Sequence, residues 1–116
     1  MHHEYASAAD RERLRDVRAA VLLRLAGLRD AADDLDRAIE YGQRAFQADL
    51  CREDVCRRLM ELYRRDGRPA DSLRVYNACN AALRSELGVG PSAPTRRLLR
   101  LIQAELQGGT LAVASS

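Results

Sequence analysis

The sequence repeats its own apolar pattern at a fixed interval, and this periodicity constrains the fold more than any other feature. A gapless shift of 34 positions aligns Val21 with Val55, Leu25 with Leu59, Leu28 with Leu62, Ala38 with Ser72, Ile39 with Leu73, Ala45 with Cys79 and Ala48 with Ala82. Large residues fill the first half of each unit and small ones the second. Self-similarity at such an interval is typical of repeat architectures. The chain is therefore predicted to contain two copies of one structural unit.

The second copy, residues 51–91, is predicted to be a pair of helices joined by a short turn. Its apolar residues recur at helical spacing, in the order Val55, Leu59, Leu62, Leu73, Tyr76, Leu83 and Leu87. Gly67 suits the left-handed position that ends a helix, and Pro69 suits the first turn of the next helix. Each unit is thus an antiparallel helical hairpin. Helical hairpins that recur with a period of about 34 residues are typical of the tetratricopeptide repeat.

The chain as a whole is expected to be all-α. We expect helices over about 10–28, 33–48, 53–66, 69–87 and 92–107. The buried stripe of the first is predicted to be Leu14, Val17, Val21, Leu25 and Leu28, and that of the last Leu98, Leu99, Ile102 and Leu106, with Arg96, Arg97 and Arg100 facing outward. Because a repeat array leaves an apolar end exposed, the fifth helix is expected to cap it.

The predicted architecture is accordingly a right-handed, tetratricopeptide-like solenoid of two hairpins and a C-terminal capping helix. Residues 1–9 are expected to be flexible, residues 10–107 to form one domain and residues 108–116 to be a disordered tail. Composition agrees with an all-α fold: 47% of the residues are hydrophobic but only 4% aromatic, so leucine and alanine must fill the interior.

Charge and hydropathy exclude several functional classes. The net charge of +2 is too small to imply nucleic-acid binding by itself, and all 19 basic residues are arginine. The sequence contains no uninterrupted apolar run long enough to span a bilayer. Its first residues also lack the apolar core of a secretion signal. We therefore expect a cytoplasmic protein.

The three cysteines are expected to be free thiols. Their odd number argues against a disulfide scaffold and for a reducing compartment. Cys51 and Cys56 are five positions apart, outside the spacing of structural zinc ligands, so we expect no metal. Cys56 and Cys79 are interpreted as small apolar core residues.

The residues that an enzyme requires are also missing. The only two histidines are His2 and His3, in a segment expected to be flexible. Asp33 and Asp34 lie at a predicted helix start, where interaction with the helix dipole accounts for them. We therefore predict no catalysis and no cofactor.

The densest basic cluster lies on and after the third predicted helix. Helical spacing favours ion pairs among its members, which gives a solvated, ion-paired face as one interpretation. The other is a contact surface for an acidic protein partner, since the first helix of each repeat lines the concave side of such an array. The candidate partner-binding residues are Arg57, Glu61, Arg64, Arg65 and Arg68.

Direct binding of nucleic acid is not expected. The cluster has no interleaved aromatic residues on which unpaired bases could stack. All five predicted helices belong to the solenoid, so none remains to read duplex DNA.

An ordered set of residues in the second unit resembles a known family. The set is Arg52-Glu53, Leu59-Met60, Gly67-Arg68, Ala70, Leu73, Val75-Tyr76, Glu86-Leu87-Gly88-Val89 and Pro91-Ser92. It is similar to the bacterial transcriptional activator domain, the tetratricopeptide-like module behind the winged-helix DNA-binding domain in actinomycete regulators of antibiotic synthesis. The resemblance extends over about residues 14–106. It implies a domain that packs on a DNA-binding domain, supports dimerisation or relays signals toward RNA polymerase.

Two functions are compatible with the sequence. The favoured one is a protein-interaction module of a transcriptional regulator, whose partner would be a winged-helix domain, RNA polymerase, a signalling domain or a second copy. The chain is then either a domain of a larger regulator or a stand-alone relative. The alternative is a general tetratricopeptide adaptor that binds a peptide of another protein. Adaptors that hold a terminal carboxylate use lysine, and this sequence has none.

Overall fold

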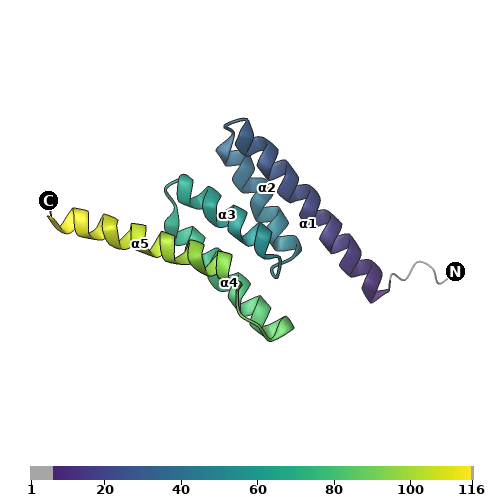
Figure 1. The fold of residues 1–116 in the computed structure, drawn as a ribbon. Coiled ribbons are helices and arrows are strands. Elements are labelled where there is room, and N and C mark those ends of the chain that lie inside the picture. The colour runs from purple at the N-terminus through teal and green to yellow at the C-terminus, as the bar shows by residue number, and fades with distance from the viewer. Residues whose placement is uncertain (1–6, 116) are drawn as a thin grey trace. The chain divides into compact units, whose positions relative to one another are not determined.

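The computed structural model describes residues 7–115, with side chains described as far as residue 108, and within that range it is all-helical. The helices are α1 (Ala8–Ala31), α2 (Leu35–Ala48), α3 (Glu53–Arg65), α4 (Pro69–Leu87) and α5 (Ala93–Ser115) (Figure 1). The predicted all-α class is confirmed. None of these helices, within the described range, is both long and apolar enough to cross a membrane.

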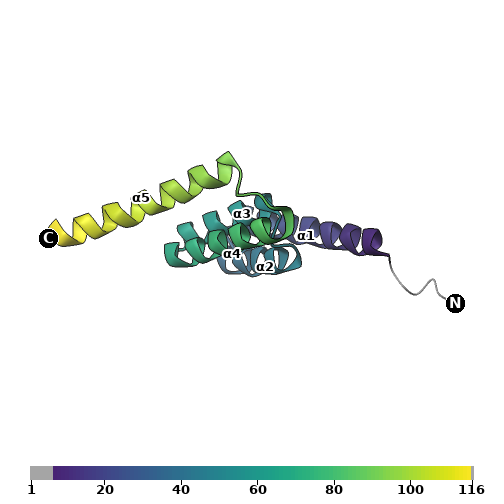
Figure 2. The same ribbon diagram turned by 90° about the horizontal axis from the view of Figure 1, so that it is seen from below.

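The chain divides into two compact units, Met1–Asp49 and Leu50–Ser116. In the first, α1 and α2 pack as an antiparallel hairpin; in the second, α3 and α4 form another, and α5 contacts both of them (Figures 1 and 2). The two predicted hairpins and the additional helix are therefore confirmed. Their stacking into a right-handed solenoid stays a prediction.

The first hairpin turns at Asp33, which adopts the left-handed backbone conformation with φ of 59°. Asp34 then caps α2, because its carboxylate accepts a hydrogen bond from the backbone N–H of Arg37 at 3.3 Å. At the other end of the hairpin, Ser7 caps α1 by accepting a hydrogen bond from the N–H of Asp10 at 3.1 Å. Helix α1 is thus longer at both ends than predicted. It includes residues 8 and 9 of the segment expected to be flexible, of which 1–6 lie outside the described residues.

The second hairpin turns where the sequence predicted. Gly67 takes the left-handed conformation, with φ of 71°, and Pro69 is the first residue of α4. Gly88 ends α4 in the same left-handed conformation, with φ of 67°. Both glycines occupy positions that other residues adopt only with strain.

The core of the first unit contradicts the predicted stripe of α1. The buried residues of α1 are Ala19, Leu22 and Ala26, which face the small residues of α2. In contrast, the predicted residues Leu14, Val17, Val21 and Leu28 are exposed and Leu25 is half-buried. Helix α1 carries two apolar faces, and at about 100° per residue they point in nearly opposite directions. Helix α2 covers the face rich in alanine because small side chains let the two backbones approach closely.

The core of the second unit contains both hairpin helices and α5. Its buried residues are Val55, Cys56, Leu59, Met60, Leu62 and Tyr63 of α3, Ser72, Val75, Cys79 and Leu83 of α4, and Thr95 and Ile102 of α5. The interpretation of Cys56 and Cys79 as core residues is confirmed, since both are fully buried. The hydrogen bond with the Cys79 thiol, followed by burial, raises the pKa of Cys56. Ser72 donates its hydroxyl hydrogen to the backbone oxygen of Met60 at 2.6 Å, which satisfies this buried polar group.

Helix α5 agrees with its predicted faces but not with its predicted end. Ile102 is buried, Leu98, Leu99 and Leu106 are half-buried, and Arg96, Arg97 and Arg100 are exposed. The helix continues through Ser115, where the sequence predicted a disordered tail over 108–116; residue 116 lies outside the described range.

Candidate functional site

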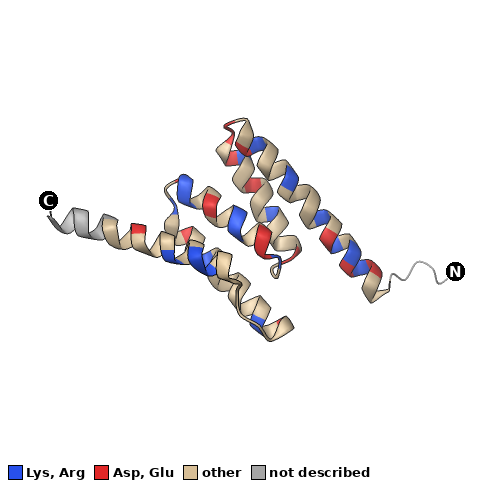
Figure 3. Ribbon diagram, viewed as in Figure 1, with Lys and Arg blue, Asp and Glu red and all other residues tan. Residues whose placement is uncertain are grey.

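The predicted partner-binding residues lie on and just after α3, the most densely charged helix of the second unit (Figure 3). Helix α3 contacts both α4 and α5, which also contact each other. The residues of the predicted set divide into three local groups, of which two join α3 to α5.

The first group centres on the carboxylate of Glu53, at the start of α3. Its Oε1 accepts three hydrogen bonds: from the N–H of Ser92 at 2.8 Å, from the Ser92 hydroxyl at 2.9 Å and from the Thr95 hydroxyl at 2.7 Å. Arg57 Nη1 donates to Thr95 Oγ1 at 2.9 Å. Glu53 thereby places a negative charge at the N-terminus of α5, where the helix dipole favours it. Thr95 is fully buried, with both its donor and its acceptor satisfied.

Two opposing effects act on the pKa of Glu53. Partial burial tends to raise it, but the hydrogen bonds from Thr95 and Ser92 and the charge of Arg57 together lower it below its usual value. A carboxylate that accepts several hydrogen bonds is stabilised in its charged form. The contact between α3 and α5 is therefore strongest when Glu53 is ionised.

The second group centres on Arg64. Its guanidinium binds the Glu105 carboxylate of α5 through two hydrogen bonds, at 2.6 and 2.7 Å, and binds Glu61 one turn earlier at 3.2 Å. The hydrogen bond with Glu105 is the main cause that raises the pKa of Arg64 and lowers the pKa of Glu105. Because two parallel hydrogen bonds join one guanidinium to one carboxylate, the pair has a fixed orientation as well as a favourable interaction energy.

The third group lies at the turn after α3. Arg68 binds Asp71 at 2.9 Å and approaches Asp66 at 3.7 Å, and its guanidinium lies over the ring of Tyr63 at 4.6 Å from the centroid. The hydrogen bond with Asp71 is the main cause that raises the pKa of Arg68. Arg65, at the end of α3, is exposed. Arg65 and Arg68 thus stand at the turn between α3 and α4, apart from the two groups that bind α5.

Residues 1–103 match the family model of the bacterial transcriptional activator domain. The chain belongs to that family. No curated protein and no solved structure matches it. The family is one of regulatory domains rather than of enzymes, in agreement with the sequence-based prediction.

In this activator domain the arginines of α3 have a clear structural role. The interpretation of this face as ion-paired is confirmed for the Glu61–Arg64 pair, and the structure adds links to Thr95 and Glu105 that sequence reasoning missed. Glu53 and Glu105 lie about 40 residues from their partners, so no local spacing could reveal them.

The activator domain offers no gathering of metal ligands in its described part. No group of three or more His, Cys, Asp or Glu residues lies together there. Cys51, half-buried in the turn before α3, donates its thiol hydrogen to Glu86 of α4 at 2.9 Å. His2 and His3 lie outside the described residues.

Proposed function

We propose that this activator domain is the protein–protein interaction module of a bacterial transcriptional regulator and acts in the cytoplasm. The observation that carries the proposal is the family match over residues 1–103. The proposed partner is a winged-helix DNA-binding domain, a signalling domain or RNA polymerase, or a second copy in a homodimer. The near-balanced charge supports contact with proteins rather than specific recognition of DNA by this chain.

The proposed contact surface on the second unit is the α3 set, Arg57, Glu61, Arg64, Arg65 and Arg68. Arginine is enriched among binding hot spots. Because Arg57 and Arg64 also hold α5, replacing them would disturb the fold and the contact together. Arg65 and Arg68 are the better probes, since both are exposed and lie at the end of α3 and in the turn that follows it.

The proposal can be tested by fusing the chain to an unrelated bacterial DNA-binding domain and measuring transcription from a reporter with that domain's operator. We expect transcription above that of the DNA-binding domain alone. An Arg65→Glu/Arg68→Glu variant should lower it, whereas Arg37→Glu on α2, also exposed and in an i,i+3 ion pair, should not. A parallel reporter scores association of two fusions of the chain with each other. Absence of both activation and self-association, with normal expression of the fusion, would count against the proposal and favour a general peptide adaptor.

A further inference from the structure

Helix α1 exposes a line of large apolar side chains on the side facing away from α2. Leu14, Val17, Val21 and Leu28 have exposed fractions of 66%, 53%, 53% and 57%. Their spacing of three, four and seven positions puts them on one narrow face of the helix. Exposed apolar residues scattered singly are ordinary, but a continuous line of four marks a surface that a partner covers. We call this line the α1 stripe.

The internal repeat shows that such a face is suited to burial. The shift that relates the two repeats carries Val21 to Val55 and Leu28 to Leu62, and both of these side chains are fully buried. The residue type is unchanged at each position. The stripe therefore has the composition of a packed helix face, although nothing in the described part of its own unit covers it.

The charges of α1 are distributed around the stripe with a clear polarity. At about 100° per residue, one edge of the stripe carries Arg11, Arg18 and Arg29 and the other Arg13 and Arg24. The acids Glu12, Asp16 and Asp30 fall on the far side of the helix. The one acid in line with the stripe is Asp10, at its N-terminal end and paired with Arg13 at 3.4 Å. The two edges of the stripe are thus basic.

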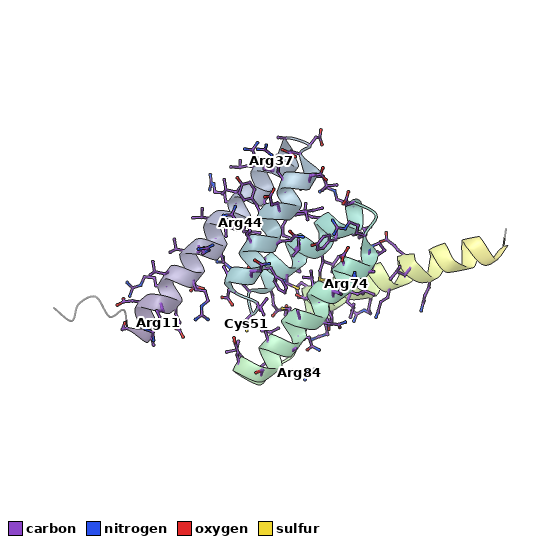
Figure 4. All side chains as sticks on the ribbon, turned by 180° about the vertical axis from the view of Figure 1, so that it is seen from behind. Arg11, Arg37, Arg44, Cys51, Arg74 and Arg84 are labelled. Carbon is purple, nitrogen blue, oxygen red and sulfur yellow. The ribbon has the colours of Figure 1, made fainter. Side chains whose placement is uncertain are left out.

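A shallow hollow opens beside the middle of the stripe, within the first unit. It has a volume of about 310 Å³ and is lined by Val21 and Leu22 of α1 and by Arg18 and Arg44. Arg44 comes from α2 (Figure 4). Its guanidinium also lies 5.7 Å from the centroid of the Tyr41 ring. An apolar floor between two guanidinium groups can accept an apolar side chain together with a neighbouring carboxylate.

We infer that the α1 stripe binds an acidic amphipathic helix of another protein. This inference rests on the proposed function and names the chemistry of one partner. From residue 14 to residue 28 the stripe is about 21 Å long at 1.5 Å per residue, which matches three turns or more of a helix with anchors at i, i+3 or i+4 and i+7. Carboxylates at the edges of that helix meet the arginines that border the stripe.

The basic edges of the stripe argue against a second copy of this chain as the occupant, and the narrow width of the stripe argues against a lipid surface. A second copy of α1 would bring arginine-lined edges against arginine-lined edges, which costs free energy. A lipid surface is better bound by a wide apolar face with aromatic residues, whereas this face is narrow and wholly aliphatic. The narrow seam is the kind that two packed helices share.

The inference is tested with the full chain and two synthetic helical peptides. Both carry leucine at i, i+3, i+7 and i+10, and one has glutamate and the other lysine along both edges. We expect fluorescence anisotropy to show binding of the glutamate peptide at least about tenfold tighter than binding of the lysine peptide, with affinity falling as salt rises.

Variants locate the binding. Val21→Ser and the charge reversal Arg18→Glu/Arg44→Glu should each weaken binding of the glutamate peptide by about tenfold or more. This is the size of effect expected when a hot-spot residue is lost. Val89→Ser and Arg97→Glu are the matched controls, being similarly exposed but in the second unit, and should change nothing. Circular dichroism confirms that each variant is folded. The charge reversal should also improve binding of the lysine peptide.

Three results would overturn the inference: equal binding of the two peptides, binding unaffected by the α1 variants, or no binding. A dimer in sedimentation velocity that Val21→Ser dissociates would assign the stripe to a second copy. Binding to vesicles rich in anionic lipid that the same variant abolishes would assign it to a membrane. If the α1 stripe does not bind the glutamate peptide while the reporter fusion still activates transcription, the inference about the stripe is wrong but the proposed function is not.

Discussion

Helices α1 and α3 occupy equivalent places in the two repeats, yet the apolar face that is open on α1 is buried on α3. In α3 the residues Val55 and Leu62 are fully buried, while their equivalents Val21 and Leu28 in α1 are more than half exposed. Helix α3 lies against both α4 and α5, whereas in the described part of its own unit α1 has α2 as its helical neighbour. The same sequence pattern thus lies on a buried face in one repeat and on an exposed face in the other.

The charges differ in the same way. Arginines of α3 bind across to α5, through Thr95 and Glu105. On α1 the ion pair between Arg13 and Asp10 joins residues of the same helix. We conclude that charged groups on α3 hold the second unit together, while those on α1 border an apolar surface.

The largest expected effect comes from truncating equivalent leucines. Leu62→Ala should lower the free energy of unfolding by about 2–5 kcal/mol, because it opens a cavity around a fully buried side chain. Leu28→Ala should change it by about 0.5 kcal/mol or less, because that side chain is already exposed. Urea unfolding measures both. Similar losses for the two variants would mean that the two faces are equally buried, which would contradict the contrast between α1 and α3.

A smaller effect is expected at the junction of α3 and α5. Thr95→Val keeps the shape of a buried side chain but removes its hydrogen bonds to Glu53 and from Arg57. The expected loss is about 1–2 kcal/mol, the range for a hydrogen bond whose partners become unsatisfied. Ser85→Ala, an exposed site on α4, serves as the control. A neutral Thr95→Val would show that these hydrogen bonds do not stabilise the second unit.

The smallest expected effect is a dependence of stability on acid. The pKa of Glu53 is lower in the folded chain than its usual value of 4.5, so the unfolded state binds a proton first as pH falls. The stabilisation by Glu53 is therefore complete above about pH 4.5 and is lost as pH falls through the folded pKa. Melting temperatures measured between pH 6 and pH 3 should fall less steeply for Glu53→Gln than for the unaltered chain. Parallel curves would contradict the assigned role of Glu53.

Local structure was largely predictable because its causes are local. Helix α4 begins at Pro69 and ends at Leu87 as predicted, since Gly67 and Gly88 supply left-handed positions that few other residues adopt. The buried face of α1 was predicted wrongly because periodicity identifies apolar faces but not the neighbour that covers them. The junction through Glu53 was missed because it joins residues about 40 positions apart, which only the packing of α5 brings together.

The most direct test of the central claim, that α1 is the open face and α3 the closed one, is hydrogen–deuterium exchange of the full chain with and without the glutamate peptide. We expect amides within residues 14–28 to become more protected on binding, while those of α3 do not change. Protection that falls on α3 instead, or binding without any change in α1, would contradict it.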